Sequence, residues 1–415
     1  MRSRSARTSA RLGRVSTPHG AFDTPAFMPV GTKGTVKGIL PPQVRASGAQ
    51  ILLNNTYHLL LRPGPLQVAA LGGVHAFMGW DGPILTDSGG YQAYSLADIN
   101  AVDDDGVTFR SIVDGSSIRM TPERSIEVQQ ALGADIIMAF DDCPPSIDPD
   151  EVRPNQARLK HAVVRDTPRR KQYDHAQRLQ LANERTVRWL ERCKAAHTRS
   201  DQALFGIVQG GTDRDARRWS AERICQVDLP GYAIGGVAVG EPHAQIVEVV
   251  RQTAPLLPEG KPRYLMGVGY ERDIVEAVRA GVDMFDCVLP TRNGRNAYAF
   301  TQTGPLRLRN AAHTVDPRPI EEGCDCPACC PAAHGWLTPG EAAMSRGYIR
   351  HLFMAEEMLG PILVTLHNLH HYQRLMGEIR ETILTDDWDG LARRWPVLGG
   401  LGEPRAEGET GGDGS

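Results

Sequence analysis

The feature that most constrains the fold is a series of short apolar runs in the first 290 residues of this 415-residue chain, each bounded by Gly, Asn or Asp. The eight runs are 25–30, 51–55, 83–87, 135–141, 203–209, 232–236, 263–268 and 283–288. They are apolar throughout rather than at alternate positions, which is typical of strands covered on both faces in a parallel sheet.

Segments with helical periodicity lie between most of these runs. Residues 121–134 begin with Thr-Pro-Glu and end near a Gly, while 243–257 and 271–282 carry apolar residues at i, i+3, i+4 and i+7. Eight strands alternating with helices predict an α/β fold of the (β/α)8 TIM-barrel type. A doubly wound open sheet is the alternative, but it usually has fewer strands and a Gly-rich phosphate loop. Neither GxGxxG nor GxxxxGK[ST] occurs in this chain.

Composition and charge exclude two other classes of protein. With 41% hydrophobic residues the chain can bury a large core, which excludes wholesale disorder. The mean hydropathy is −0.32, and no apolar stretch reaches the roughly 18 residues of a transmembrane helix.

The net charge is only −3, yet residues 151–200 contain 13 Lys and Arg against 5 Asp and Glu. This basic stretch is either a solvated helical face or a surface that meets phosphates.

We divide the chain into four segments. Residues 1–14 carry five Arg and no acid, and we expect them to be disordered, with only a faint likeness to an organelle-targeting segment. Residues 15–300 form the barrel, with a basic insertion near 147–175. Residues 301–385 form a zinc-binding subdomain with closing C-terminal helices. Residues 386–415 form a tail whose Gly-rich, acidic end we expect to be disordered. We expect the protein to be cytoplasmic.

The region after the last apolar run contains a candidate metal site. It is flanked by a predicted hairpin (296–310) and by two helical stretches (346–360 and 369–384). Four of the eight cysteines lie within seven residues, which in a long chain without a secretory signal indicates metal rather than disulfides. Thiolates at Cys324, Cys326 and Cys329 need one more ligand for tetrahedral zinc. The candidates are Cys330, His334 and His367, which is expected to open a helix. Three thiolates and a histidine leave no open position, so the zinc would be structural.

Polar residues cluster where the apolar runs end. They are Asn54 and Asn55, Asp87 to Gly90, Asp141 and Asp142, Gln209 to Gly211, Gly235 and Gly236, and Asp286. In a barrel these ends converge on one mouth, where active sites are built. Any one of them is explained better by a strand that stops at a turn former, but six on one face favour a site.

Three carboxylates, Asp87, Asp141 and Asp286, end different strands and could face one another across the mouth. Two carboxylates flanking one bond suit substitution at an anomeric carbon, where one attacks and the other moves a proton. A competing interpretation starts from Ser88, because DSGG also surrounds the nucleophile of trypsin-like proteases. That chemistry needs a partnering His and an all-β scaffold. A zinc hydrolase barrel would require His-x-His near the first strand, and none occurs.

Ten ordered motifs run from about residue 10 to about residue 385. They are TPAFMPVGTKGTVKG, NNTYHLLLRPG, LTDSGGYQ, GVTFRSIVDG, ADIIMAFDDC, FGIVQGG, IGGVAVGE, RYLMGVG, MFDCVLPTRNGRN and CDCPAC followed by HNL. Together they resemble the tRNA-guanine transglycosylases, the tRNA-ribosyltransferases of queuosine biosynthesis.

The resemblance implies exchange of guanine 34 in tRNAs with a GUN anticodon, those of the Asp, Asn, His and Tyr type. Asp286 matches the nucleophile that attacks C1′ of the ribose, and Asp87 matches the general acid/base. The implied reaction is a double displacement through a covalent ribosyl-aspartate, which retains the configuration at C1′.

The resemblance also implies the binding residues. The 7-deazaguanine base would contact Asp87, Ser88, Tyr91, Asp141, Gln209, Gly235, Gly236, Val237 and Met266, with Tyr91 and Met266 sandwiching the ring. Arg292 and Arg295 match positions that meet anticodon nucleotides. One structural zinc per chain would be held by Cys324, Cys326, Cys329 and His367. Members of this family are typically homodimers.

Two positions bear on which base is inserted. Cys143 and Val239 resemble the bacterial pattern, whereas eukaryotic members tend to have Val and Gly there, which makes room for the cyclopentenediol of queuine. The implied substrate is therefore the smaller 7-aminomethyl-7-deazaguanine, preQ1. Archaeal members carry an RNA-binding extension for which the end of this chain is too short and too Gly-rich.

The chain departs from the family pattern in three places. It is longer after Cys143, where the basic run lies, and longer between Cys329 and His367, which brings Cys330 and His334 within reach of the metal. Tyr270 stands where many bacterial members have Lys. A non-catalytic tRNA-binding subunit, as in eukaryotic heterodimers of the family, remains the alternative function, although the three aspartates are intact.

Overall fold

The centre of the molecule is a closed parallel barrel. The structure, a computed structural model, describes residues 1–92, 99–148, 174–238, 241–336 and 344–399. The barrel strands are β4 (Ala26–Met28), β5 (Val30–Gly31), β6 (Leu52–Asn54), β7 (Ile84–Thr86), β11 (Ile136–Met138), β12 (Ala203–Val208), β13 (Gly231–Ile234), β14 (Arg263–Leu265) and β15 (Met284–Asp286). Their order is β4-β15-β14-β13-β12-β11-β7-β6-β5. Because β4 and β5 are consecutive pieces of one run, pairing with β15 and β6 respectively, the sheet closes. All eight apolar runs therefore contain barrel strands, and the open-sheet alternative is wrong.

The runs are apolar throughout because each strand has two buried faces. Phe205 and Ile207 of β12 point into the barrel interior, where they pack with Met28 and Met138. The alternate residue Leu204 belongs instead to the core between the sheet and the outer helices. This is the alternation of side chains along a strand, with both sides covered.

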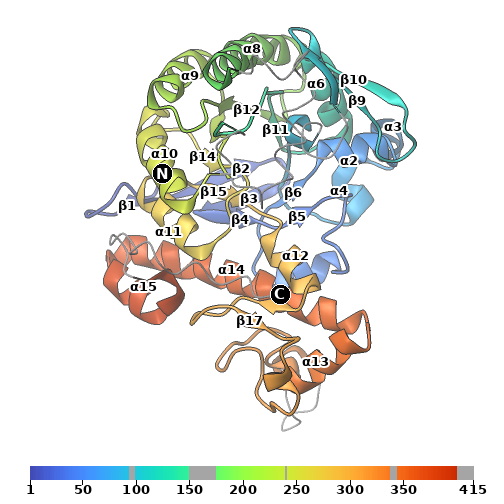
Figure 1. Cartoon of the computed structure of the whole chain (residues 1–415), viewed down its shortest axis with the longest axis vertical. Coiled ribbons are helices and arrows are strands. Elements are labelled where there is room, and N and C mark those ends of the chain that lie inside the picture. The colour runs from blue at the N-terminus through green and yellow to red at the C-terminus, as the bar shows by residue number, and fades with distance from the viewer. Residues whose placement is uncertain (93–98, 149–173, 239–240, 337–343, 400–415) are drawn as a thin grey trace.

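Helices surround the barrel (Figure 1). They are α1 (Pro41–Ala46), α2 (Thr56–Leu61), α3 (Pro65–Ala70), α4 (Gly73–Met78), α6 (Pro122–Leu132), α8 (His175–Ala196), α9 (Arg214–Gln226), α10 (His243–Thr253) and α11 (Glu271–Arg279). Three of them, α6, α10 and α11, occupy the helical segments that the sequence predicts. Helix α6 begins where the Thr121 hydroxyl accepts from the amide of Arg124, and it ends at Gly133, whose φ is 76°. Such ends are the favoured N-cap and left-handed C-cap.

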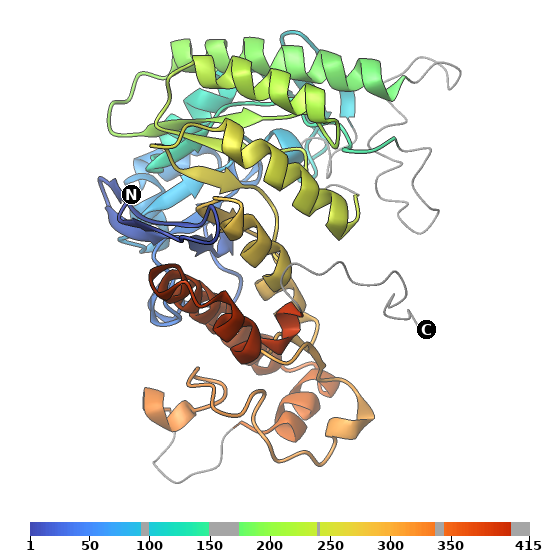
Figure 2. The ribbon, with the colours of Figure 1, turned by 90° about the vertical axis from the view of Figure 1, so that its left-hand side faces the viewer.

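The N-terminal segment contradicts the expectation of disorder over residues 1–14. It contains β1 (Ser3–Arg4) and the start of β2 (Arg11–Thr17), which pair with each other, and β2 pairs with β3 (Gly20–Thr24). Arg11 forms a buried ion pair with Asp283 at 2.5 Å. Phe22 of β3 packs into the barrel interior, and Figure 2 shows these strands at one end of the barrel. Arg4 and Arg7 likewise pair with distant acids, Glu259 and Asp389, whereas Arg2 and Arg14 pair with Asp23 of β3.

A second small sheet was not expected. It consists of β8 (Ile99–Asp103), β9 (Gly106–Arg110) and β10 (Ser117–Met120), all antiparallel, and lies in the chain between β7 and α6. Val107 and Phe109 of β9 are buried in the core outside the barrel sheet. The sheet is therefore attached to the outside of the barrel by its own buried apolar residues.

The C-terminal third contains the expected subdomain. After β15 and α12 (Leu289–Arg295), β16 (Tyr298–Ala299) and β17 (Leu306–Arg307) form the predicted hairpin. Helices α13 (Arg346–Met354) and α14 (Leu359–Thr385) follow, and α14 packs between α11 and α1 against β4, in the place of an eighth barrel helix. Helix α15 (Trp388–Arg394) extends beyond it.

The expectation that His367 opens a helix is wrong. His367 lies within α14, because that helix already begins at Leu359. Most of the basic insertion (149–173) and the end of the tail (400–415) lie outside the described residues. Within the described part of the chain, no helix combines the length and apolar character that a membrane-crossing segment needs.

Candidate active site

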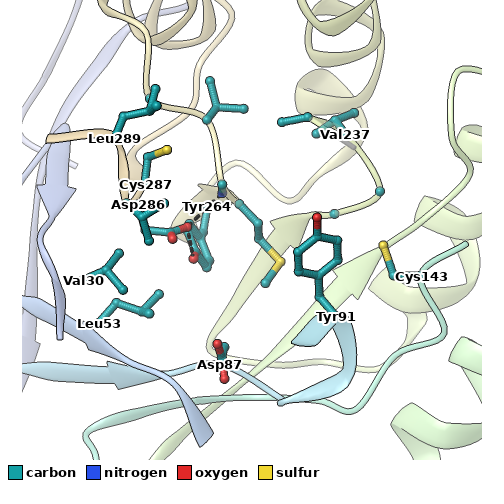
Figure 3. Close-up of a pocket in the computed structure, with 18 of the residues that line it drawn as sticks. Val30, Leu53, Asp87, Tyr91, Cys143, Val237, Tyr264, Asp286, Cys287 and Leu289 are labelled. Carbon is teal, nitrogen blue, oxygen red and sulfur yellow. Dashed lines mark hydrogen bonds between the residues drawn. The ribbon is translucent and has the colours of Figure 1, made fainter. Parts of the chain in front are cut away.

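A cavity of about 730 Å³ opens at the carboxyl ends of the barrel strands. All nine residues that the sequence predicts to bind the base line it: Asp87, Ser88, Tyr91, Asp141, Gln209, Gly235, Gly236, Val237 and Met266. Asp286 and Arg292 line it as well. Figure 3 shows Asp286 and Asp87 facing the same space from different strands. The mouth of the barrel therefore gathers the polar strand ends.

Asp87 follows β7 and is held by three donors. Its Oδ1 accepts from the amide of Thr56 at 2.9 Å, and its Oδ2 accepts from the side-chain amides of Gln92 at 2.8 Å and of Asn55. Burial raises the pKa of Asp87 to about 6, these hydrogen bonds oppose the rise, and the charge of Asp286 adds to it. A carboxyl group with a pKa close to neutral can both accept and release a proton in the working pH range.

Asp286 ends β15 and is held through one oxygen only. The Tyr264 hydroxyl donates to Oδ1 at 2.5 Å, and the amide of Gly267 donates to the same oxygen at 2.9 Å. Burial raises the pKa of Asp286, and these two bonds oppose the rise. Among the described residues nothing donates to Oδ2. One oxygen is thus fixed in place, and the other is available to a substrate in the cavity.

Asp141 forms a second polar centre together with Ser88 and Gln209. The Ser88 hydroxyl donates to Oδ1 at 2.9 Å, and the Gln209 amide donates to Oδ2 at 2.6 Å. Burial and the neighbouring Asp142 raise the pKa of Asp141 to about 6. Because Ser88 faces a carboxylate, and no histidine is among the described residues lining the cavity, the geometry lacks the base that a serine hydrolase requires.

The remaining predicted residues lie in different places relative to the cavity. Tyr91 is 44% exposed, and Tyr270 is 53% exposed at the start of α11. Arg292 lines the cavity from α12 and is exposed, whereas Arg295 on the same helix is half-buried and does not line it. Cys143 is buried in the wall. Val239, on which part of the base-size argument depends, lies outside the described residues.

The cysteine cluster is buried away from this cavity. The Nδ1 atom of His367 lies 3.7, 3.4 and 3.4 Å from the Sγ atoms of Cys324, Cys326 and Cys329. Bonds of about 2.3 Å to sulfur and 2.0 Å to nitrogen place such atoms roughly 3.5 Å apart in a zinc tetrahedron. His367 uses its other nitrogen, Nε2, to donate to the carbonyl of Phe300 at 2.7 Å, which leaves Nδ1 as the ligand.

These four side chains therefore fit a metal ion. His334 lies outside the group and bonds through Nε2 to the carbonyl of Asp325. Cys330 lies outside it as well, so neither of the other candidate ligands completes the cluster.

A second cluster, formed by His19, His75 and Asp135, has a different character. Each imidazole bonds to one oxygen of Asp135 at 2.9 Å, and the two rings stack with centroids 3.6 Å apart and planes inclined by 11°. A metal-binding lone pair lies in the plane of its ring, so two nearly parallel, stacked rings cannot both direct a lone pair at one ion. This cluster is a hydrogen-bonded clasp between the N-terminal hairpin and the barrel.

Sequence reasoning missed several residues that shape the site. Tyr264 sits in an apolar run, and nothing in its neighbourhood distinguishes it from a core aromatic residue. Arg217 lies in the charged helix α9, yet it is 1% exposed and bonds to the strand ends beneath the cavity. Asn55 was noticed as a strand-end residue but not as a partner of Asp87. These roles depend on contacts between distant elements, so the sequence carries no local signal for them.

Fold and site together define a class: a (β/α)8 barrel protein with paired acidic groups at its mouth and an attached Cys3His subdomain. The sequence model described as queuine tRNA-ribosyltransferase matches residues 5–165 and 161–396. The chain belongs to this family.

Individual relatives agree with the family match. A protein of Thermus thermophilus is 51% identical over 386 residues, which cover 93% of this chain and 90% of that protein. Proteins of Herpetosiphon aurantiacus and Desulforamulus reducens are each 50% identical, over 93% and 91% of this chain and 89% and 92% of their own lengths. All three are named queuine tRNA-ribosyltransferase.

Proposed function

We propose that this chain is a tRNA-guanine(34) transglycosylase that replaces guanine 34 of GUN-anticodon tRNAs with preQ1. The observation that carries the proposal is the pairing of Asp286 and Asp87 around one cavity, with different hydrogen-bond surroundings. Two carboxyl groups in such an arrangement suit a double displacement at a glycosidic carbon. Membership of the family supports the same activity.

In the first step, Oδ2 of Asp286 attacks C1′ of the ribose, the C1′–N9 bond breaks, and protonated Asp87 gives its proton to the leaving guanine, which leaves Asp87 ionised. Tyr264 and Gly267 hold Oδ1, so that the attacking oxygen points at the cavity. In the second step the ionised Asp87 takes a proton from the incoming base, whose N9 attacks C1′ and displaces Asp286. Two inversions restore the original configuration.

Recognition of the base rests on the second polar centre. Asp141, oriented by Ser88 and Gln209, accepts from the N–H groups of a guanine-like ring, and the backbone at Gly235, Gly236 and Val237 lies next to it. Tyr91 and Met266 enclose the ring faces, a common use of aromatic and thioether side chains around an extruded base. Arg292 and Arg295 meet the phosphates or bases of the anticodon.

The preference for preQ1 over queuine rests on Cys143 and Val239. We further propose one zinc ion per chain, held by Cys324, Cys326, Cys329 and His367. When bound, it would have no open coordination position and would fasten residues 324–329 to α14. A cytoplasmic homodimer is the state in which we expect the enzyme to act.

The test is incorporation of labelled guanine into a tRNA with a GUN anticodon, compared with the same tRNA carrying adenine at position 34. Incorporation only into the first tRNA supports the proposal, and incorporation into neither contradicts it. Competition between preQ1 and queuine then tests the base preference. The non-catalytic alternative predicts tRNA binding without any exchange.

A further inference from the structure

Beneath the base-binding loop lies a buried arginine that bonds only to backbone carbonyls. Arg217 of α9 is 1% exposed. Its Nε donates to the carbonyl of Gly211 at 2.8 Å and its Nη1 to that of Val208 at 3.2 Å. Nη1 and Nη2 also donate to the carbonyls of Gly235 and Gly236, at 2.6 and 2.9 Å. One guanidinium thus joins the carboxyl ends of β12 and β13.

A guanidinium in this position is costly to bury. No ion pair of Arg217 occurs among the described residues. Burial lowers its pKa to about 10 and the negative charge of the buried Glu241 opposes the fall, so the group is still charged at neutral pH. A buried charge with no hydrogen-bonded acid is a poor source of stability compared with an apolar side chain of similar volume. The placement therefore indicates a role other than stability.

The geometry of the peptide bond shows what that role is. The C=O and N–H of a trans peptide point in opposite directions. Because Arg217 holds the carbonyls of Gly235 and Gly236, the N–H groups of Gly236 and Val237 point away from it. Gly235, Gly236 and Val237 line the cavity, whereas Arg217 does not. Within the described part of the chain, neither N–H group has an acceptor.

We propose that Arg217 is a positioning residue: it orients and polarises two adjacent peptides so that their N–H groups face the base as a donor pair. The guanidinium draws electron density toward the carbonyls, which strengthens the donors on the other side of each peptide. Such a pair selects a ring that presents a carbonyl oxygen there and rejects one that presents an amino group. The inference rests on the proposed function, because it names the discrimination made in the same cavity.

The variant Arg217→Lys tests this, because it keeps the charge but loses the planar fork that reaches four carbonyls. Arg263 supplies a matched control: it is also buried, also bonds to carbonyls, those of Leu257 and Gly281, and lies at the opposite end of the barrel. Titration calorimetry of the full chain measures affinity for guanine and for 2,6-diaminopurine, which has an amino group in place of the carbonyl and also lacks the N1–H. Because the loss of N1–H weakens 2,6-diaminopurine equally in wild type and variant, the change in the ratio of the two affinities on substitution is the readout.

We expect Arg217→Lys to weaken guanine binding by about 10- to 100-fold while leaving 2,6-diaminopurine and tRNA binding unchanged. Arg263→Lys should lower the melting temperature without altering the ratio of the two base affinities. A folded Arg217→Lys protein with a wild-type ratio would overturn the inference. If the wild-type protein binds no guanine, the proposed function fails rather than the role of Arg217.

A measurement on the wild-type chain covers the case in which the variant does not fold. Hydrogen exchange resolved to single amides, at concentrations of each base that saturate the cavity by calorimetry, should show the Gly236 and Val237 N–H groups protected by guanine but not by 2,6-diaminopurine. Equal protection by both bases would contradict the donor pair.

Discussion

Gly236 offers the sharpest test of how the base site is built, through the substitution Gly236→Ala. Its φ is 62°, in the left-handed region, and a Cβ atom there would overlap with Oε1 of Gln209. Gly79, at the end of α4, has a φ of 68° and nothing within 4 Å of a Cβ. Gly79→Ala is therefore a matched control with the same backbone strain and no collision.

The two substitutions share one backbone strain, but only Gly236→Ala should also disturb the base site. Left-handed strain costs about 1–2 kcal/mol in the free energy of unfolding at either position. At Gly236 the Gln209 side chain must also move, which breaks its 2.6 Å bond to Asp141. A hydrogen bond to a charged group is worth roughly 1.5–3 kcal/mol, or about 10- to 150-fold in affinity for guanine.

Calorimetric titration with guanine measures the affinity for the base, and unfolding by denaturant measures the free energy of unfolding. We expect weak guanine binding in Gly236→Ala only. The unfolding free energy should fall in both variants, and it should fall further in Gly236→Ala by about the 1.5–3 kcal/mol of the lost bond. If Gly236→Ala binds guanine within about twofold of the wild type, the contact between Gln209 and Asp141 does not organise the base site.

Three further predictions concern protons and metal. Because burial raises the pKa of Asp87 to about 6 and the ionised form accepts the proton of the incoming base, kcat/KM for the incoming base should fall as the pH drops below about 6, and a pH-independent kcat/KM for that base down to pH 5 would refute the role. Although burial opposes it, hydrogen bonds from His75 and His19 lower the pKa of Asp135 to about 2. The ionised Asp135 therefore stabilises the fold at pH values above about 4, which is the pKa of this carboxyl group in the unfolded chain. This stabilisation is lost as the pH falls toward 2. The difference in unfolding free energy between wild type and Asp135→Asn should shrink over that range, and a constant difference would contradict the clasp. Cys326→Ala should lose its zinc in metal analysis while the neighbouring Cys330→Ala retains about one ion per chain, and equal zinc contents would refute the ligand set.

The barrel could be predicted from the sequence because its signal is local. Each parallel strand is buried on both faces, so runs such as 203–209 are apolar throughout and stand out from their surroundings. In a parallel barrel the carboxyl ends of all strands lie at the same end of the barrel. The sequence therefore predicts that Asp87 and Asp286 lie near each other, although it shows no contact between them. The resemblance to the family added roles to those positions.

Features that depend on distant partners could not be predicted. Arg11 looked like part of a disordered basic segment, because its partner Asp283 is 272 residues away. The sheet formed by β8 to β10 has no continuous apolar run and is held by a few residues such as Phe109. Tyr264 and Arg217 act on neighbouring strands, so their surroundings exist only in the folded chain.

The central claim is that Asp286 forms a covalent bond to the ribose. The direct measurement is mass spectrometry of the protein after incubation with tRNA and a base analogue that occupies the cavity but cannot be inserted. We predict a denaturant-stable adduct with the mass of protein plus tRNA minus guanine, located at Asp286 and absent in Asp286→Asn. An adduct of equal yield in Asp286→Asn, or exchange by the wild-type protein with no adduct at Asp286, would contradict the account.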